Sequence, residues 1–350
     1  MTRVAARRRP LARHLAVAFC SIALASFAAG CTDVKEGLEK ADDTLSGTLL
    51  GAEGAQTGDS GEAPLTETDL ATSLYESGLK LKSEGKDAEA FDRFRSAADR
   101  GHAGAAYELG EAYGAGRGVD QDTAAGARWT NTAAERGDPR AQYAIGAAYY
   151  NGEGVGQDYG RAVEYLGKAA EQGHADAQFL LGECYANGRG VTKDLSWAAR
   201  WYGKAAAQGH AEGAFSYGVV QAAGLGVPVD MPLGYGWLDI ASDRGHAKAG
   251  EVRAAIANKM TPEEIERGKR YAAAFTADSG AAFADRPTVR YVQHSLNQLG
   301  FNAGSVDGLM GPRTRNAIQA YLTSIGDSGG SATVTPALLQ RLRESQRGAA

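Results

Sequence analysis

Residues 137–172 read GDPRAQYAIGAAYYNGEGVGQDYGRAVEYLGKAAEQ, and residues 173–208 read GHADAQFLLGECYANGRGVTKDLSWAARWYGKAAAQ. When the two segments are aligned, glycines, a G-x-G-V stretch, an aspartate and a later aromatic residue fall at the same places. The pattern extends beyond both segments, because glycines recur every 36 residues without insertion or deletion at Gly101, Gly137, Gly173, Gly209 and Gly245. A strict repeat period of about 20 to 50 residues is the signature of a solenoid, in which stacked units bury a continuous core.

Each 36-residue unit predicts a pair of helices joined by a glycine-containing loop. In the unit that begins at Gly101, small and apolar residues recur at helical spacing over residues 103–113. Gly116 and Gly118 follow in the loop, where we expect positive φ angles that glycine alone adopts without strain. Asp122 then stands where a helix N-cap belongs, and the next repeat glycine ends the second helix.

A further glycine lies inside each predicted first helix, at Gly110, Gly146, Gly182 and Gly218. Glycine inside a helix costs about 1 kcal/mol relative to alanine. We therefore expect a packing role for it, in which the missing side chain lets the partner helix approach closely.

Less regular helical segments flank the repeats. Apolar residues from residue 69 onward predict an atypical first hairpin, as expected of a capping unit. Thr261-Pro262-Glu263-Glu264 has the residues of a capping box and predicts a last helix that ends at about residue 275. The fourth repeat departs most from the others, since Gln221 replaces a tyrosine and prolines enter its loop and second helix. The solenoid is expected to cover residues 69–275, with full repeats at 101–136, 137–172, 173–208 and 209–244.

The amino terminus has the composition of an export signal. Five arginines and no acidic residue lie among the first 30 residues, which end in an apolar stretch that begins at Leu15. That stretch is short for a membrane span, so residues 1–30 predict a signal peptide. Residues 31–68, rich in Gly, Ser, Thr, Asp and Glu, predict a flexible tether. Residues 31–350 carry 32 basic and 42 acidic residues, a net charge of −10, and no basic patch among them indicates a nucleic-acid partner.

The pattern A-x-x-x-L-G-x-x-Y-x-x-G-x-G-V-x-x-D, followed by A-x-x-W-x-x-x-A-A-x-x-G, resembles the Sel1-like repeat, a relative of the tetratricopeptide repeat. The resemblance covers residues 101–245 and implies an all-α fold, a right-handed α-solenoid of Sel1-like helix pairs. Related solenoids bind proteins on the concave surface formed by successive first helices. Candidate contact positions on that surface are Glu111, Gln142, Tyr150, Asn151, Gln178, Glu183 and Asn187. For each of them, an exposed polar residue without a partner is the alternative interpretation.

Residues 287–345 form a separate predicted module, after a linker at residues 276–286. The string V-x-x-V-Q-x-x-L-x-x-L-G-F, with V-D-G-x-x-G-x-x-T-x-x-A-I after it, resembles the peptidoglycan-binding domain found beside many cell-wall hydrolases. The resemblance implies a small three-helix fold around the D-G-x-x-G-x-x-T turn. The candidate peptidoglycan-binding residues that it implies are Asp307, Gly308, Gly311, Arg313, Thr314 and Tyr321. The sequence departs from the family at Tyr321-Leu322, where Phe-Gln is usual, and in the polar insert GDSGGSA.

Ala28-Ala29-Gly30-Cys31 resembles the bacterial lipobox, although Ala28 stands where leucine is usual. The resemblance implies that Cys31 is lipidated and becomes the mature amino terminus, and Thr32 after it favours the outer membrane. Two or more acyl chains anchor a protein firmly, because each buried methylene contributes about 0.8 kcal/mol. The alternative is ordinary signal-peptidase cleavage that leaves Cys31 free.

The sequence predicts no catalytic set, no cofactor and no metal site. The G-x-G-V stretch lacks the Lys-Ser/Thr and the preceding strand of a phosphate loop. Four histidines follow repeat glycines in separate units, so we expect them at helix ends rather than together around a metal: His102, His174, His210 and His246. Cys184 takes the place of small apolar residues in the other repeats and is expected to be buried.

These patterns predict a non-catalytic scaffold or adaptor, lipid-anchored in the bacterial periplasm. It binds an unidentified envelope protein through the solenoid and peptidoglycan through the carboxy-terminal module. One alternative is a regulatory accessory of a peptidoglycan hydrolase or of a polysaccharide-export complex. Another is an enzyme that itself cleaves peptidoglycan.

Overall fold

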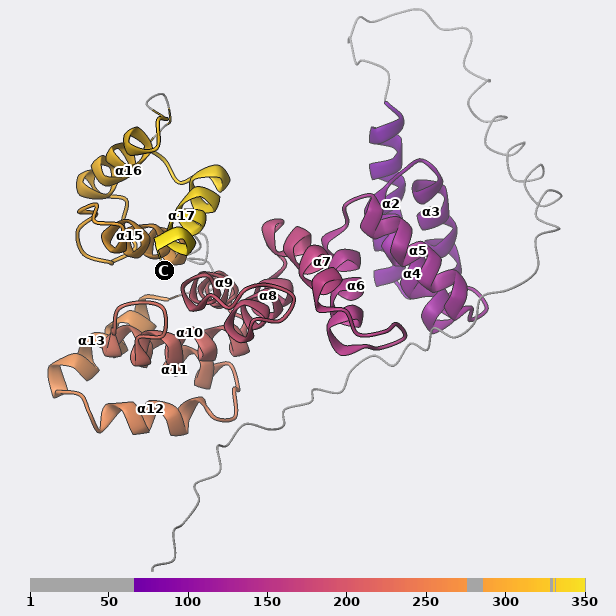
Figure 1. Ribbon diagram of the computed structural model, residues 1–350. Helices are drawn as coiled ribbons and strands as arrows, with labels where there is room; N and C mark the ends of the chain where they lie inside the picture. The colour runs from indigo at the N-terminus through magenta and orange to yellow at the C-terminus, as the bar shows by residue number, and fades with distance from the viewer. Residues whose placement is uncertain (1–65, 276–285, 328–329, 331, 350) are drawn as a thin grey trace, which may run out of the picture.

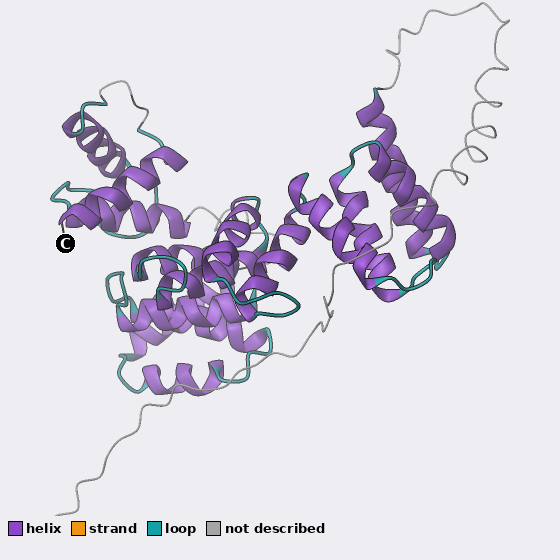
Figure 2. Cartoon of the chain, turned by 45° about the vertical axis from the view of Figure 1, so that its right-hand side comes forward, coloured by secondary structure: helices purple, strands orange, loops and turns teal. Residues whose placement is uncertain are grey.

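The computed structural model describes residues 66–275, 286–327, 330 and 332–349, and the regular elements of these residues are all helices (Figures 1 and 2). The predicted fold class, an α-solenoid followed by a small helical domain, is confirmed. The signal segment, Cys31, most of the tether and residues 276–285 of the linker lie outside the described residues. In the described part of the chain, none of the helices has both the length and the apolar composition that crossing a bilayer requires.

The solenoid begins with a hairpin of α2 (Glu67–Ser83) and α3 (Asp87–Asp99). Four repeats follow, each of two 13-residue helices: α4 (Ala103–Ala115) and α5 (Thr123–Glu135), α6 (Pro139–Asn151) and α7 (Tyr159–Glu171), α8 (Ala175–Asn187) and α9 (Leu195–Ala207), α10 (Ala211–Ala223) and α11 (Met231–Asp243). The array ends with α12 (Ala249–Ala257) and α13 (Pro262–Ala274), and the capping box predicted at Thr261 is present.

Local sequence sets the ends of these helices as predicted. The Asp158 side chain accepts a hydrogen bond from the backbone N–H of Arg161 at 3.0 Å, which satisfies one of the amides left unpaired at the start of α7. In the loop of the first repeat, Gly118 has a φ of 70°. A Cβ atom at Gly118 would lie 2.3 Å from the carbonyl oxygen of Asp87, so this close approach of two backbones requires glycine.

The glycine inside each first helix serves packing, as predicted. A Cβ atom at Gly146 would lie 2.9 Å from Leu166 Cγ and 3.0 Å from the backbone nitrogen of the same residue. Helix α7 therefore packs against α6 more closely than any side chain at this position permits.

The buried apolar residues form two clusters. One contains residues of α3 to α6, from Ala90 to Ala141. The other begins at Ala162 in α7 and continues through α8 to α11 into the carboxy-terminal domain, as far as Leu342. The last two repeats and the carboxy-terminal domain therefore share one continuous core.

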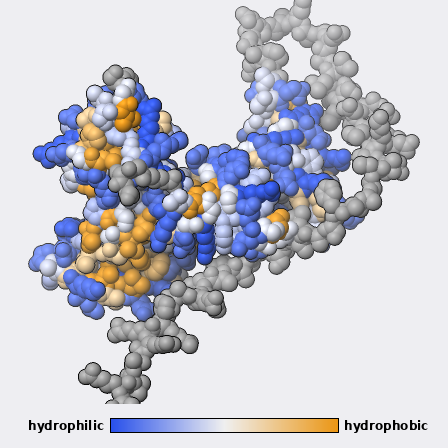
Figure 3. Space-filling view, in the orientation of Figure 1, coloured by the Kyte–Doolittle hydropathy of each residue, from blue (hydrophilic) through white to orange (hydrophobic). Residues whose placement is uncertain are grey.

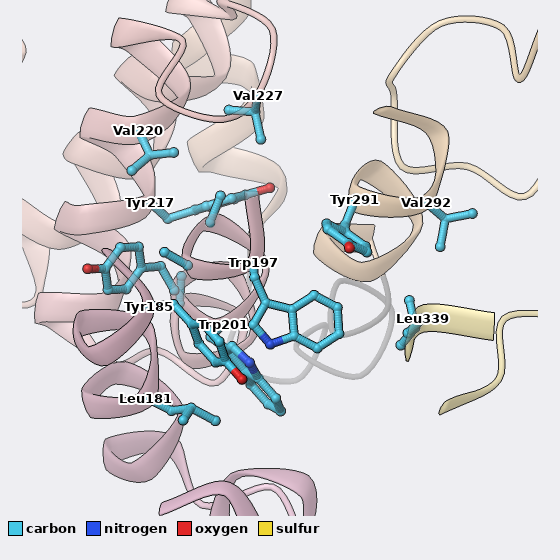
Figure 4. Packing of buried hydrophobic residues seen from close by; sticks show 14 of the residues in the cluster. Leu181, Tyr185, Trp197, Trp201, Tyr217, Val220, Val227, Tyr291, Val292 and Leu339 are labelled. Atoms are coloured by element: carbon cyan, nitrogen blue, oxygen red, sulfur yellow. The ribbon is translucent and has the colours of Figure 1, made fainter. Parts of the chain in front are cut away.

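The carboxy-terminal domain consists of α15 (Arg286–Gln298), α16 (Pro312–Ser324) and α17 (Pro336–Ala349). It lies beside α9, and α15 packs on that helix (Figure 1). Tyr291 of α15 points towards Trp197 of α9, with the two rings edge to face and their centroids 4.9 Å apart (Figure 4). A Cβ atom at Gly203 would lie 2.5 Å from Pro287 Cβ, so the two helices meet at a glycine. The sequence pattern gave no indication of this contact between the module and the repeats.

Candidate functional site

One buried glutamine organises the turn of the carboxy-terminal domain. Gln293 of α15 is 2 % exposed, and its Nε2 donates to Asp307 Oδ1 at 2.9 Å and to Thr314 Oγ1 at 3.1 Å. Its Oε1 accepts from the backbone N–H of Gly308 at 2.8 Å. These hydrogen bonds require a side chain that both donates and accepts, because the turn presents oxygen acceptors and a backbone N–H donor. Gln293 is therefore the residue that holds the D-G-x-x-G-x-x-T turn.

The predicted peptidoglycan-binding residues divide into buried and exposed ones. Thr314 and Tyr321 are each 2 % exposed, and Gly308 is buried. The interpretation of these three as wall contacts is wrong, because their side chains or backbone are occupied inside the domain. Tyr321, for example, pairs its hydroxyl with Ser345 Oγ at 2.9 Å.

Asp307, Gly311 and Arg313 remain accessible on this turn. Partial burial opposes ionisation of Asp307, but hydrogen bonds from Gln293 and from the Leu309 backbone hold its pKa below the ordinary range. Leu309 is 53 % exposed beside these polar groups. The turn therefore offers a carboxylate, a guanidinium and an apolar side chain to a ligand.

A hollow of about 520 Å³ opens between the end of α16 and α17 in the same domain. Arg341 and Asp327 form an ion pair on its wall. Glu344 and the exposed Ile325 also line it. It offers charged groups of both signs within one concave surface.

Two of the predicted solenoid contact residues are inside the repeat stack. Gln142 and Gln178 are 4 % and 2 % exposed, and each Nε2 donates to a carbonyl oxygen at the end of the preceding second helix. Their Oε1 atoms accept from Gln172 Nε2 and Gln208 Nε2, both at 2.8 Å. The prediction that they contact a partner is wrong, because these glutamines join successive repeats.

The other predicted contact residues are at least partly accessible: Glu111, Tyr150, Asn151, Glu183 and Asn187. Four of them have a side-chain partner: Glu111 Oε2 lies 3.7 Å from Arg117 Nη2, and Asn187 Nδ2 donates to Glu183 Oε2 at 3.2 Å. Glu183 accepts from the Tyr202 hydroxyl, and the Tyr150 hydroxyl accepts from Arg189. These residues line the first helices of the first three repeats, and their contact with a partner stays a prediction.

Three of the four histidines are N-cap residues, His102, His174 and His210, and the fourth, His246, follows the end of α11. His174 Nδ1 accepts from the backbone N–H of Ala177, and its ring stacks on Tyr143 of the preceding repeat with centroids 4.6 Å apart. His210 repeats this arrangement on Phe179. Each ring therefore caps a helix and packs against the repeat before it. Within the described residues, no three His, Cys, Asp or Glu side chains are grouped as a metal ion requires.

Cys184 is fully buried in α8, as predicted. Burial raises the pKa of its thiol to about 12. The thiol is therefore protonated at neutral pH and packs as a small apolar side chain.

A pair of residues nine apart recurs at one edge of the repeats: Tyr113 and Asp122, Tyr149 and Asp158, Tyr185 and Asp194, and Gln221 and Asp230. In every pair the aspartate N–H donates to the carbonyl oxygen of the first member, over 2.8 to 3.0 Å. One carboxylate oxygen caps the second helix in every repeat. The pair thus has a constant backbone geometry in all four repeats, and the cap uses only one of the two carboxylate oxygens.

In three of the four repeats, an arginine side chain contacts both members of this residue pair. In the second repeat, Arg161 donates to the Tyr149 hydroxyl at 2.9 Å and has its Nε 3.7 Å from Asp158 Oδ2. In the third repeat, the arginine comes from α17. Arg343 donates to the Tyr185 hydroxyl at 3.0 Å and has its Nε 3.4 Å from Asp194 Oδ2.

The fourth repeat takes its arginine from α15. Arg290 Nη2 donates to Gln221 Oε1 at 3.0 Å and to Asp230 Oδ2 at 3.3 Å. Gln221 is fully buried, so this contact explains why glutamine replaces the tyrosine of the other repeats. Arg290 also packs its Cγ close to Gly308, so the same arginine joins the solenoid to the turn of the carboxy-terminal domain.

The Sel1 repeat family model matches residues 103–138, 139–174, 175–210 and 211–246. The chain contains four Sel1 repeats. A second family, described as "Putative peptidoglycan binding domain", matches residues 285–321. The resemblances to the Sel1-like repeat and to the peptidoglycan-binding domain are confirmed. Sel1 repeats indicate protein–protein interaction, and the second family indicates peptidoglycan binding.

Solved structures similar to this chain include a Sel1 repeat protein from Oxalobacter formigenes, at 37 % identity over 49 % of each chain with a TM-score of 0.45. A protective antigen of uropathogenic Escherichia coli strains, with an SLR fold, is 24 % identical, over 73 % of this chain and 61 % of that one, with a TM-score of 0.49. The chain thus spans about half and about three fifths of the lengths of these two proteins. No curated protein matches the chain.

Proposed function

We propose that this Sel1 repeat protein is a non-catalytic adaptor of the bacterial cell envelope. Its solenoid binds a protein partner, its carboxy-terminal domain binds peptidoglycan, and lipidation of Cys31 anchors it to a membrane, in our proposal the outer membrane. The observation that carries the proposal is the core shared by the last repeats and the carboxy-terminal domain. Because the two parts are packed together, a partner on the solenoid is held at a fixed position relative to the wall.

Two attachments on one chain reinforce each other. Once the carboxy-terminal domain is on the wall, a lipid anchor finds its membrane at a raised effective concentration, and the reverse also holds. Neither attachment then needs high affinity by itself.

Binding of the full chain to purified sacculi tests the wall contact. We expect co-sedimentation, and we expect Arg313→Ala to weaken it, because Arg313 is an exposed cation on the turn. The same replacement at Arg270 in α13, an exposed arginine outside the domain, is the matched control. Equal retention of all three proteins would contradict the assignment of the turn. No retention of the unaltered protein would contradict wall binding itself.

Two further measurements test the rest of the proposal. Cys31→Ser is expected to move the protein from the membrane fraction to the soluble fraction, and continued membrane association would contradict lipidation of Cys31.

Incubation of the purified protein with sacculi is expected to release no soluble muropeptides. Their release would show an enzyme instead of an adaptor.

A further inference from the structure

The first repeat contains the same residue pair as the others, but its arginine site is open within the described residues. The backbone N–H of Asp122 donates to the Tyr113 carbonyl oxygen at 2.9 Å, and Asp122 Oδ1 accepts from the Ala125 backbone at 2.8 Å. These contacts match those of the three filled pairs. No arginine of the described residues pairs with Asp122 Oδ2.

Two local features explain why this site is open. The second repeat fills its own site with Arg161, three residues after the aspartate, whereas the first repeat has Ala125 at that position. The two arginines that come from the carboxy-terminal domain reach only the third and fourth repeats. Neither source of a guanidinium is therefore present at the first repeat.

The open site has a second carboxylate two residues before Asp122. Asp120 occupies this position, where the other repeats have Gly156, Thr192 and Pro228. Asp120 and Asp122 are both exposed, and Tyr113 is partly exposed with its ring held edge to face by Phe91. A carboxylate, a phenol oxygen and a ring face together suit a planar guanidinium, which donates several hydrogen bonds and stacks on aromatic rings.

We propose that Tyr113 and Asp122 form a binding site for an arginine side chain of another protein. The inference rests on the proposed role of the solenoid in protein binding and states which chemistry that partner presents. The partner docks on the same edge of the repeats that the carboxy-terminal domain covers further along, and it inserts an arginine as α15 and α17 do. The arginine fixes the position and register of the partner, since one exposed ion pair contributes little affinity alone.

Labelled, amidated tetra-arginine and tetra-lysine peptides are suitable probes, because they have equal charge and differ in the guanidinium. Fluorescence anisotropy with the full chain at low salt is expected to show about fivefold tighter binding of tetra-arginine. Asp122→Asn keeps an N-cap acceptor and removes the charge, and Tyr113→Phe removes only the hydroxyl. Each is expected to abolish most of the preference for arginine.

Asp158→Asn is the matched control, because Arg161 already fills the site of the second repeat. It is expected to leave the preference unchanged. Ala125→Arg places an arginine where the second repeat has Arg161, and it is expected to close the site and to lower tetra-arginine binding as Asp122→Asn does. Circular dichroism melting of each variant shows whether the fold is intact.

The proposal is overturned if Asp122→Asn and Tyr113→Phe, both folded, keep the preference for arginine, or if Asp158→Asn loses it equally. Self-association of the unaltered protein that Asp122→Asn abolishes would assign the site to a second copy, and this would overturn the choice of partner. A solenoid partner whose binding is insensitive to all these variants would refute the arginine site while leaving the proposed function standing.

Discussion

The second and third repeats have nearly the same scaffold but differ in what covers their second helices. Helix α7 is open to solvent at Gly167, where an added Cβ would meet nothing within 4 Å. Helix α9 is covered at the equivalent Gly203 by Pro287 of the carboxy-terminal domain. The arginine on the tyrosine–aspartate pair is local in the second repeat and comes from α17 in the third.

The same surface of a repeat is therefore exposed to solvent in one unit and covered by the carboxy-terminal domain in another. The residues that stack the repeats are shared, so the edge formed by the N-caps is present in every unit. Whether a unit exposes that edge or covers it depends on a few substitutions, such as Trp197 in place of Arg161. Figure 3 shows a further change towards the fourth repeat, where hydrophobic residues gather over α10 and α11.

The largest expected effect is that of Gln221→Tyr, which gives the fourth repeat the tyrosine of the others. Gln221 is fully buried against Arg290, so the larger ring displaces the guanidinium and leaves a buried charge short of a partner. We expect the free energy of unfolding to fall by about 3 kcal/mol. Urea denaturation measures it. Tyr149→Gln in the second repeat is the reverse change at a partly exposed position, and it should cost less.

Gly203→Ala and Gly167→Ala compare the covered surface of α9 with the open surface of α7. At Gly203 the new methyl group would lie 2.5 Å from Pro287 Cβ, so docking of α15 is obstructed and we expect a loss of about 2 kcal/mol. At Gly167 the site is open and alanine is the better helix former, so we expect a gain of up to about 1 kcal/mol. Thermal melting of the two variants should therefore shift in opposite directions. Equal shifts would mean that α15 does not dock on α9 as described.

The helix ends and the internal helix contacts were predictable from the sequence, because they depend on local rules. Asp158 caps a helix by its position alone, and Gly146 is explained by a partner 20 residues later in the same repeat. The docking of the carboxy-terminal domain was not predictable. Periodicity shows which face of a repeat is buried, but not which distant helix covers the outside, so the roles of Arg290 and Arg343 stayed hidden.

The error at Gln142 and Gln178 has a different cause. Polarity alone predicts that a glutamine on a first helix lies at the surface, although each of these glutamines has a partner glutamine 30 residues later, at Gln172 and Gln208. The first and fourth repeats have alanine at the first position and arginine at the second, for example Ala106 and Arg136. Their arginine instead donates to a backbone carbonyl, as Arg136 does to Ala98. The two positions therefore change together from repeat to repeat, glutamine with glutamine and alanine with arginine, and this joint change indicates that they are in contact.

Asp194→Asn and Asp158→Asn compare the two arginine pairs without removing the N-caps. The Arg343–Asp194 pair has side chains 17 % and 18 % exposed, whereas those of Arg161 and Asp158 are 63 % and 47 % exposed. Solvent screens the second pair more strongly, so we expect a loss of about 1 kcal/mol for Asp194→Asn and a smaller loss for Asp158→Asn. Denaturation at low and high salt measures both. A larger loss at Asp158 would contradict the stronger pairing of the covered edge.

The smallest expected effect concerns the junction of the second and third repeats, where His174 caps α8. Burial lowers the pKa of His174, with Arg140 and His210 acting in the same direction and the carboxylates of Asp176 and Asp138 opposing it. An unfolded histidine has a pKa of about 6.5, so the unfolded state binds the proton first as the pH falls. The contribution of neutral His174 to the free energy of unfolding is therefore complete above about pH 6.5. It is lost as the pH falls from there through the pKa of His174 in the folded state. His174→Asn keeps a capping acceptor at this position and removes the titrating ring, as Asp138 does at the junction of the first and second repeats. Denaturation between pH 8 and pH 5 should give a flatter dependence for this variant than for the unaltered chain, and parallel curves would mean that His174 takes up its proton without disturbing the junction.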